Sequence, residues 1–346
     1  MENLIKNKII LVTGGTGSIG RELVKQLLKF EPKQIRIFSR DQSKQLFLQH
    51  ELGNNDIVRY FIGDIRDKER VELAVENVDI IFHAAALKHV VSCEYNPFEA
   101  IKTNINGLQN VIESALKNNV ERFVYISTDK AVEPSNIMGS TKSLGEKLVS
   151  NAYYYKGKKR TIFSSVRFGN VLNSEGSVLQ IWKKQIEKGN EITITEPEMR
   201  RFFMSIPQAA QLVLHALNYT QVNEIFVLKM PVMRVMDLAD VLIDELTSKY
   251  GRRKEDIKIK FIGKGDGERM HEKLMTEEEA ERAIETQEFF IVRPPLLIPY
   301  KKEHITPYLL PNGLKMQKEI KGYSTENSKI LDKDEIRALL IKEGLI

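Results

Sequence analysis

The sequence predicts an α/β fold, with a Rossmann-like doubly wound parallel sheet and a smaller mixed α/β lobe. Short runs rich in β-branched and aromatic residues alternate with segments of helical spacing through the first half of the chain. This alternation is typical of parallel strands with helices on both faces. The glycine-rich stretch TGGTGSIG directly follows the first such run. After about Asn173 the alternation weakens, which predicts a second, less regular unit.

Six runs of the first half are predicted to be strands, because each is apolar, rich in β-formers and bounded by turn residues. They are KIILVTG, QIRIFS, IVRYFIG, DIIFHAA, RFVYIST and TIFSSVRF, at residues 8–14, 34–39, 57–63, 79–85, 122–128 and 161–168. Between them, apolar residues recur at the spacing of a helix face. The predicted helices cover residues 21–30, 44–52, 70–77, 104–118 and 143–155.

The second half mixes helices and isolated strands. Helices are predicted at residues 178–189, 206–219, 236–251 and 332–344, and strands at 191–195, 224–230 and 257–263. We therefore expect residues 1–172 with 204–230 to form the Rossmann domain. Residues 173–203 with 231–346 are expected to form the smaller, substrate-binding lobe.

Composition limits the function classes. The chain has 346 residues, 42% of them hydrophobic, and no run near the roughly 18 apolar residues of a membrane helix. The charged start MENLIKNK leads into a strand, so we expect neither a secretory signal nor membrane insertion. The one cysteine, Cys93, excludes an internal disulfide, and these features together favour a cytoplasmic protein.

Charge and histidine spacing give no reason to expect nucleic acid or a metal. The net charge of +5 comes from interspersed residues of both signs, which fits small anionic ligands equally well and, from composition alone, is most simply an ordinary soluble surface. His83, His89 and His271 do not have the spacing of metal ligands, so no metal is predicted.

The glycine-rich turn predicts a dinucleotide site. Gly14, Gly17 and Gly20 follow a strand and open a helix, which lets the backbone approach a pyrophosphate at the helix N-terminus. The alternative is a glycine-rich turn without a ligand. The expected contacts from this segment are Thr13, Gly14, Thr16, Gly17, Ser18, Ile19 and Gly20.

The end of the second predicted strand bears on the choice of cofactor. An arginine there suits the 2′-phosphate of NADP, whereas an acidic residue suits the free ribose of NAD. The chain reads Ser39-Arg40-Asp41. Ser39 and Arg40 favour NADP, and Asp41 leaves NAD open. The alternative for Arg40 is an ordinary surface cation.

Two further strand ends fit the same dinucleotide. Asp64 and Ile65, in GDIRD, are expected at the adenine, with the carboxylate accepting from its exocyclic amine. Three small residues, Ala84, Ala85 and Ala86, would let the backbone lie against the cofactor. Either segment could instead be a plain turn.

Ordered motifs carry a specific resemblance. They are TGGTGSIG, GDIRD, HAAALKHV, TNINGLQNV, STDKA and RFGNV. In this order they resemble the extended short-chain dehydrogenase/reductases. Within that family, CEYNPFEAIKTN, STDKAVEP, MRRFFMSI and GERMHEKL are similar to the inverting UDP-N-acetylglucosamine 4,6-dehydratases of surface-polysaccharide and glycan biosynthesis. The resemblance covers about residues 8 to 285.

The resemblance implies a reaction in which C4 of the sugar is oxidised, water is lost across C5–C6, and the hydride returns to C6. In the family pattern Asp129 protonates the departing C6 hydroxyl and Lys130 takes the C5 proton. Related retaining enzymes have glutamate at the lysine position, so Lys130 implies inversion at C5. The alternative is that Lys130 only pairs with Asp129. As a base at neutral pH, Lys130 would need a lowered pKa.

Met138 departs from the wider family, which has a catalytic tyrosine there. A subset of the inverting dehydratases also resembles this chain in having methionine. Met138 and Lys142 are four residues apart, on one helix face. The resemblance implies that Lys142 binds the nicotinamide ribose and Thr128 the C4 oxygen. Our hypothesis is that Thr128 orients the C4 hydroxyl and that Asp129 or Lys130 accepts its proton.

The remaining expected contacts come from the same resemblance. Those to the cofactor are Lys88, Asn104, Lys142, Phe168, Gly169, Asn170 and Val171. Those to the UDP-sugar are Lys88, Asp129, Lys130, Asn170, Arg201, Glu268 and Arg269. Because Arg200 occupies a position where the family usually has threonine, the choice between Arg200 and Arg201 stays open.

Two other functions remain as alternatives. A UDP-sugar 4-epimerase would share the fold, although the absent tyrosine and the Asp129-Lys130 pair argue against it. An NADP-binding regulator without catalysis has Met138 as its support. The resemblance also implies a homo-oligomer, with a hexamer as one form, and UDP-N-acetylglucosamine or a similar UDP-sugar as substrate.

Overall fold

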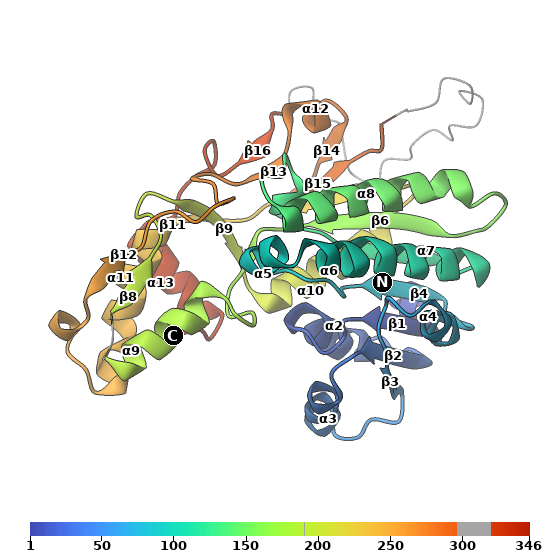
Figure 1. The fold of residues 1–346 in the computed structure, drawn as a ribbon, viewed down its shortest axis with the longest axis horizontal. Helices are drawn as coiled ribbons and strands as arrows, with labels where there is room; N and C mark the ends of the chain where they lie inside the picture. The colour runs from blue at the N-terminus through green and yellow to red at the C-terminus, as the bar shows by residue number, and fades with distance from the viewer. Residues whose placement is uncertain (190, 296–319) are drawn as a thin grey trace.

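The computed structural model describes residues 1–189, 191–295 and 320–346 (Figure 1). Within these residues, nine strands form one sheet in the order β14-β15-β10-β6-β5-β4-β1-β2-β3. Their bounds are β1 Ile9–Thr13, β2 Gln34–Ser39, β3 Val58–Ile62, β4 Ile80–His83, β5 Arg122–Ile126, β6 Ile162–Arg167, β10 Ile225–Leu228, β14 Ala283–Glu285 and β15 Phe289–Val292.

The strand order places the functional cleft. β1 to β6 and β10 run parallel, whereas β15 is antiparallel to β10, and β14 to β15. The order reverses between β1 and β4, because the chain first adds strands on one side of β1 and then on the other. In doubly wound sheets ligands bind at the carboxyl ends of the strands beside such a reversal.

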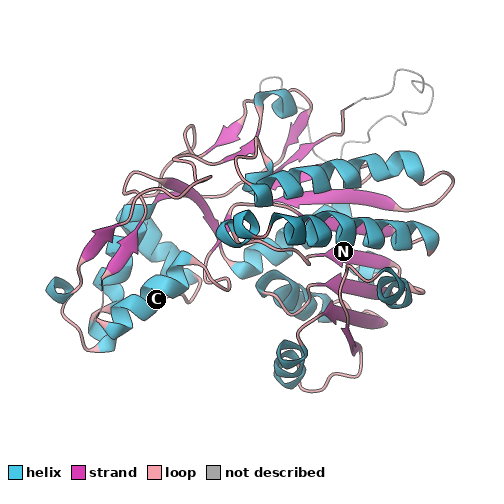
Figure 2. Ribbon diagram, in the orientation of Figure 1, coloured by secondary structure: helices cyan, strands magenta, loops and turns pink. Residues whose placement is uncertain are grey.

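Helices cover both faces of the sheet (Figure 2). Ile10 and Val12 of β1 share a core with Leu23 of α2 (Ser18–Leu28) and with α10 (Ile206–Tyr219). Leu11, between them, lies in a separate core. That second core also draws on α4 (Lys68–Val75), α7 (Leu108–Lys117) and α8 (Ile137–Tyr155). Successive strand residues point to opposite faces, so this alternation buries the sheet on both sides.

A smaller lobe has its own core around Trp182, which is 1% exposed. Its main elements are α9 Val178–Lys188, β8 Ile192–Ile194, α11 Val235–Leu246, β12 Ile259–Phe261 and α13 Lys333–Lys342. A three-stranded sheet joins it to the large sheet through β7 Asn170–Val171, β9 Arg200–Met204 and β11 Val232–Arg234. Figure 1 shows this lobe to one side of the large sheet.

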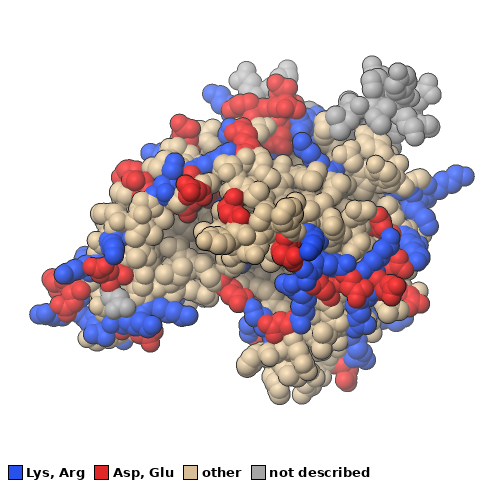
Figure 3. All heavy atoms as spheres, viewed as in Figure 1, with Lys and Arg blue, Asp and Glu red and all other residues tan. Residues whose placement is uncertain are grey.

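The other described elements include one helix of ten residues, α3 Gln42–Glu51, and several shorter ones. The shorter ones are α1 Glu2–Ile5, α5 Val90–Tyr95, α6 Pro97–Ile101, a π-helix Lys102–Gly107, β13 Lys273–Met275, α12 Glu277–Ala280, β16 Tyr323–Ser324 and 3₁₀ turns Asp129–Ala131, Ser248–Tyr250 and Lys254–Asp256. Charged residues of both signs are interspersed over the face in Figure 3.

The predicted fold class is confirmed, since a large parallel sheet carries helices on both faces. One arrangement differs from the expected division of the chain. β14 and β15 lie within 231–346, which was assigned to the smaller lobe, yet they pair in the large sheet and pack in its core. Each has only three or four residues, too few for a periodic pattern. Residue 190 and residues 296–319 of the expected lobe lie outside the described residues.

Candidate active site

A cavity of about 850 Å³ lies at the carboxyl ends of β1, β4 and β5 and is lined by both parts of the molecule. Most of the residues expected from the sequence line it. They are Gly14, Thr16, Gly17, Ser18, Ile19, Gly20, Ser39, Arg40, Asp64, Ile65, Ala84, Ala85, Ala86, Lys88, Thr128, Asp129, Lys130, Met138, Lys142, Phe168, Gly169, Asn170, Val171, Arg201 and Glu268. Three expected residues do not line it: Thr13, Asn104 and Arg269.

The turn after β1 has the geometry that glycine permits. Gly14 has φ +66°, and an added Cβ there would lie 2.7 Å from the backbone nitrogen of Ala85. A Cβ at Gly20 would overlap the carbonyl oxygen of Gly14. α2 begins at Ser18 without a side-chain cap on its first turn. Its N-terminal N–H groups are therefore placed to bind an anion at the cavity.

The end of β2 separates the two polar residues that bear on cofactor choice. The Asp41 carboxylate accepts from the backbone nitrogen of Lys44 at 2.9 Å and caps α3. Arg40 lines the cavity, and its Nη1 lies 3.6 Å from Asp64 Oδ2. Asp64 also accepts from Arg66 Nη2 at 2.7 Å. Both residues line the cavity, but the Asp41 carboxylate is also used in capping α3.

Two expected cofactor residues support the cavity wall from behind. Thr13 is buried, and its Oγ1 lies 2.9 Å from His83 Nδ1. Asn104, in the π-helix, accepts from Leu87 N at 2.8 Å and donates to Leu87 O at 3.0 Å. These bonds fix the loop after β4, which lines the cavity. The structure therefore places Thr13 and Asn104 as supports, because both side chains are used inside the protein.

Thr128, Asp129 and Lys130 form a compact hydrogen-bonded group at the end of β5. Thr128 Oγ1 donates to Asp129 Oδ1 at 2.7 Å, and Lys130 Nζ donates to Asp129 Oδ2 at 3.0 Å. Burial would raise the pKa of Asp129, but the Lys130 ammonium and the Thr128 hydroxyl outweigh it and lower the pKa. Asp129 is therefore held as a carboxylate.

The pKa of Lys130 moves in the direction opposite to the one a free base needs. Burial would lower it, but the carboxylates of Asp129 and Glu272 outweigh burial and raise the pKa above its ordinary value. Two carboxylates thus hold Lys130 as an ammonium. The ion pair considered as an alternative from the sequence does exist in the structure.

Lys142 and Met138 extend from α8, which Asn136 caps by accepting from Gly139 N at 2.8 Å. Lys142 Nζ donates to the carbonyl oxygen of Ile126 at 2.5 Å. Burial lowers the pKa of Lys142 to about 7, although Glu146 opposes the shift. Met138 is buried and packs with Cys93 and Ala100.

Glu272 was not predicted as a site residue, yet it lies at the centre of several that were. Its Oε1 is 3.3 Å from Lys130 Nζ and 3.1 Å from Arg201 Nε. Its Oε2 accepts from Asn170 Nδ2 at 2.9 Å. Within GERMHEKL the expectation fell on Glu268 and Arg269 instead. No local pattern marks Glu272, because its partners come from distant segments.

Some of the other expected substrate residues line the cavity and some do not. Arg201 lines the cavity, whereas Arg200 does not, which decides between the two arginines in favour of Arg201 as the cavity residue. Glu268 lines the cavity and accepts from Gly265 N at 3.1 Å. Arg269 Nη1 donates instead to the carbonyl oxygen of Val132 at 3.4 Å. The structure therefore does not bring Arg269 to the site.

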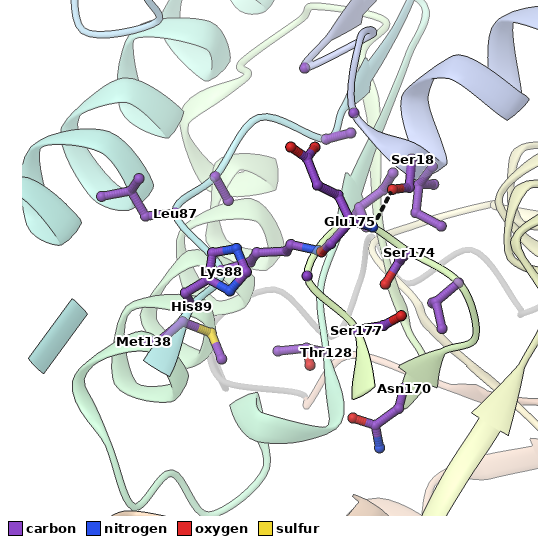
Figure 4. Close-up of a pocket in the computed structure, with 18 of the residues that line it drawn as sticks. Ser18, Leu87, Lys88, His89, Thr128, Met138, Asn170, Ser174, Glu175 and Ser177 are labelled. Atoms are coloured by element: carbon purple, nitrogen blue, oxygen red, sulfur yellow. Dashed lines mark hydrogen bonds between the residues drawn. The ribbon is translucent and has the colours of Figure 1, made fainter. Parts of the chain in front are cut away.

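Glu175, which was also not predicted, joins the smaller lobe to the glycine turn. Its backbone nitrogen donates to Ser18 Oγ at 3.0 Å (Figure 4). Lys88 Nζ donates to its carbonyl oxygen at 2.6 Å, and Lys44 Nζ to its carboxylate at 2.6 Å. These three contacts cross one side of the cavity, and Figure 4 shows Lys88 reaching toward Glu175.

Two kinds of feature are absent from the described ranges, 1–189, 191–295 and 320–346. No group of three or more histidine, cysteine or acidic side chains in them is arranged to hold a metal ion. In these same ranges no helix is long and apolar enough to cross a membrane.

Comparison with known proteins gives consistent matches over nearly the whole chain. Residues 10–294 match the family described as polysaccharide biosynthesis protein. The chain is 51% identical over 340 residues to an uncharacterized membrane protein of Methanocaldococcus jannaschii, covering 98% of this chain and 97% of that protein. It is 39% identical over 329 residues to the inverting UDP-N-acetylglucosamine 4,6-dehydratase of Campylobacter jejuni, covering 94% of each.

A further relative bears a different activity. The chain is 38% identical over 339 residues to the UDP-glucose 4-epimerase of Rickettsia canadensis, covering 97% of this chain and 96% of that protein. Among solved structures, Pen from Bacillus thuringiensis matches with a TM-score of 0.89 and 41% identity over 98% of both chains. DesIV, a dTDP-glucose 4,6-dehydratase of Streptomyces venezuelae solved with NAD, shares the fold at a TM-score of 0.66 and 19% identity, over 76% of this chain and 86% of that one.

Proposed function

The chain belongs to the polysaccharide biosynthesis protein family, and from this premise we propose that it is a C5-inverting UDP-N-acetylglucosamine 4,6-dehydratase working with bound NADP. The observation that carries the proposal is the pair of Asp129 and Lys130, with 3.0 Å between carboxylate and ammonium, in the cavity at the ends of parallel strands. A relative with 39% identity bears the same activity.

The residues of the glycine turn fit a dinucleotide. The turn is packed so closely that added methyl groups at Gly14 and Gly20 would meet backbone atoms, and the uncapped start of α2 offers N–H groups to a pyrophosphate. A nicotinamide held there supplies reversible hydride transfer. Arg40 and Asp41 both line the cavity; Arg40 offers a guanidinium to a 2′-phosphate, whereas the Asp41 carboxylate already accepts from Lys44 N in capping α3. This arrangement supports NADP over NAD.

The proposed proton path uses Thr128 and Asp129 without a phenol. As C4 is oxidised, its hydroxyl gives a proton through Thr128 Oγ1 to the Asp129 carboxylate, along the 2.7 Å hydrogen bond between them. Asp129 is then a neutral acid and protonates the C6 hydroxyl, which leaves as water. The proton released at C4 is thus the proton used at C6. This balance explains how Met138 can stand where a tyrosine is usual.

Lys130 acts at C5. The C4 ketone makes the C5 proton acidic, and Lys130 takes that proton while water leaves. A proton returns to C5 in the inverted configuration after the hydride reaches C6.

Arg201 supplies a guanidinium suited to a diphosphate, from a position that lines the cavity.

The expected homo-oligomer stays a prediction, and analytical ultracentrifugation would measure the oligomeric state.

A UDP-sugar 4-epimerase is the second candidate, because a relative with 38% identity is named as one. Mass spectrometry of UDP-N-acetylglucosamine incubated with the purified protein separates the two. Dehydration lowers the product mass by one water, whereas epimerisation leaves the mass unchanged. Proton NMR in deuterated water then checks for deuterium and inversion at C5. Unchanged mass with a new epimer would replace the dehydratase proposal by the epimerase.

A further inference from the structure

Glu272 is a buried carboxylate directly behind the proposed catalytic pair. Its side chain is 7% exposed and does not line the cavity. Arg201 Nε lies 3.1 Å from Oε1, and Asn170 Nδ2 and Phe202 N donate to Oε2 at 2.9 and 3.4 Å. With these contacts on both oxygens, the carboxylate faces Lys130 in a fixed position. Such a group can act on the reaction only through a neighbour.

The proposed reaction leaves Lys130 with one proton too many. Lys130 is an ammonium in this arrangement, and an ammonium cannot take the C5 proton. Two described carboxylates contact Nζ, those of Asp129 and Glu272. Asp129 already holds the proton that came from C4 when C5 is to be deprotonated. Of the two carboxylates, only Glu272 is then free to accept the proton of Lys130.

We infer that Glu272 is a positioning residue that accepts one proton from Lys130 across the 3.3 Å between Nζ and Oε1, and so frees the amine that attacks C5. The inference rests on the proposed function. An N–H bond of Lys130 breaks and an O–H bond of Glu272 forms. Lys130 then takes the C5 proton. Because C5 is inverted, the new proton comes to the opposite face from a water molecule in the cavity, such as the one lost from C6, and the hydroxide that is left takes a proton from Lys130. Glu272 finally gives its proton back to Lys130, which restores the starting ion pair.

The surroundings of Glu272 suit a group that changes its protonation state. Burial and the nearby Asp129 carboxylate raise its pKa, while Lys130 and Arg201 oppose the shift. These three are the charged side chains that face Glu272 among the described residues. A neutral Lys130–Glu272 pair leaves no charge on the buried Glu272 side chain, which favours the transfer because an unpaired buried charge is costly.

The test separates oxidation at C4 from deprotonation at C5. In Glu272→Gln the shape and one oxygen remain, but the side chain can no longer accept a proton. With NADP and UDP-N-acetylglucosamine, we expect reduced nicotinamide to form within about threefold of the wild-type rate. Deuterium uptake at C5 and loss of water should slow at least about 100-fold, the usual scale of acid–base catalysis. KM should change by less than about threefold, and Glu272→Asp should recover about a tenth of the wild-type rate or more.

One matched control and three alternative outcomes complete the test. Glu278→Gln removes an exposed carboxylate of the same segment and should leave all rates unchanged. Wild-type deuterium uptake in Glu272→Gln would overturn the inference while leaving the dehydratase intact. An equal loss of C4 oxidation and C5 exchange, with a raised KM, would show that Glu272 only maintains the shape of the site. A wild-type protein that removes no water would overturn the proposed function and the inference together.

Discussion

Lys142 Nζ lies 4.1 Å from the centre of the Tyr125 ring. The amine is buried beside that ring and bonded to a backbone carbonyl oxygen, with Glu146 as an opposing charge. Burial lowers the pKa of Lys142 to about 7, and it lowers the pKa of the nearby His83 to about 3, so His83 is neutral. Burial also raises the pKa of Tyr125. Around neutral pH, therefore, Lys142 is the group of this cluster that titrates.

This leads to a stability prediction for Lys142→Met. The lysine pKa is about 7 in the folded protein and about 10.4 in the unfolded chain. Between these values the unfolded state binds one more proton, so stability rises with pH. The free energy of unfolding of the wild type, relative to the variant, should rise by up to about 1.4 kcal/mol per pH unit from about pH 7.5 to 9.5. Urea unfolding of both proteins across this pH range measures the difference in free energy of unfolding. A difference that does not change with pH would contradict the lowered pKa of Lys142.

Replacing Lys130 by alanine should lower kcat for water loss by about 100-fold to 10,000-fold, because the proposed base at C5 is removed. Mass spectrometry over time measures the rate at which a product lighter by one water is formed. Lys273→Ala is a matched control, since Lys273 pairs with Glu133, which does not line the cavity. Full activity in Lys130→Ala would reject the assigned role.

A methyl group at Gly20 should weaken dinucleotide binding strongly. The added Cβ overlaps the Gly14 carbonyl oxygen, so the turn proposed to receive the pyrophosphate must shift. Titration with NADPH, followed by nicotinamide fluorescence, should show at least about a 100-fold weaker Kd, given the several phosphate contacts of such a turn. Gly157→Ala, where nothing lies within 4 Å of the new Cβ, should bind normally. Tight binding by Gly20→Ala would place the dinucleotide elsewhere.

Arg40→Ala tests the choice between NADP and NAD. A guanidinium paired with a 2′-phosphate contributes about 1.5–3 kcal/mol, so the variant should lose about 10- to 150-fold in NADP affinity. Its NAD affinity should change little. Calorimetric titration of both cofactors gives the ratio. An equal loss for both would show that Arg40 contacts a part that NAD and NADP share.

Arg167 supports the site from within the protein. It donates to Glu146 Oε2 at 2.6 Å and to Glu279 Oε2 at 2.8 Å, and its side chain is 5% exposed. Arg167→Met would leave two carboxylates unpaired and should cost about 3–5 kcal/mol of unfolding free energy. Arg253→Met, which loses a pair with the exposed Asp256, should cost less than about 1 kcal/mol. Similar losses in urea unfolding would contradict the buried network.

The sequence predicts local features better than distant contacts. β1 and the glycine turn could be predicted because strand composition and glycine spacing act within a few residues. Thr128, Asp129 and Lys130 are adjacent, so their proximity was predictable. Glu272 was missed because it contacts Lys130 across 142 positions of the chain. β14 and β15 were missed because their apolar runs are short, and only pairing with each other and with β10 identifies them as strands.

Some expected residues have roles that a linear pattern cannot separate from ligand contact. Asn104 follows the family pattern, yet its amide is used on the backbone of Leu87. Asp41 sits at a strand end where an acid could meet a ribose, yet it caps a helix. For Asn104 the position of the neighbouring backbone groups decides between the two uses, whereas Asp41 caps α3 and still lines the cavity.

The bonds of Ser18, Lys44 and Lys88 to Glu175 tie the irregular lobe to the turn where a dinucleotide would place its phosphates. Exchange of that dinucleotide with free nucleotide would require these ties to open. The chemistry proposed here never requires exchange, since electrons taken from the sugar are given back to the same sugar. The turnover rate of such a catalyst would not depend on the ratio of reduced to oxidised dinucleotide in its surroundings.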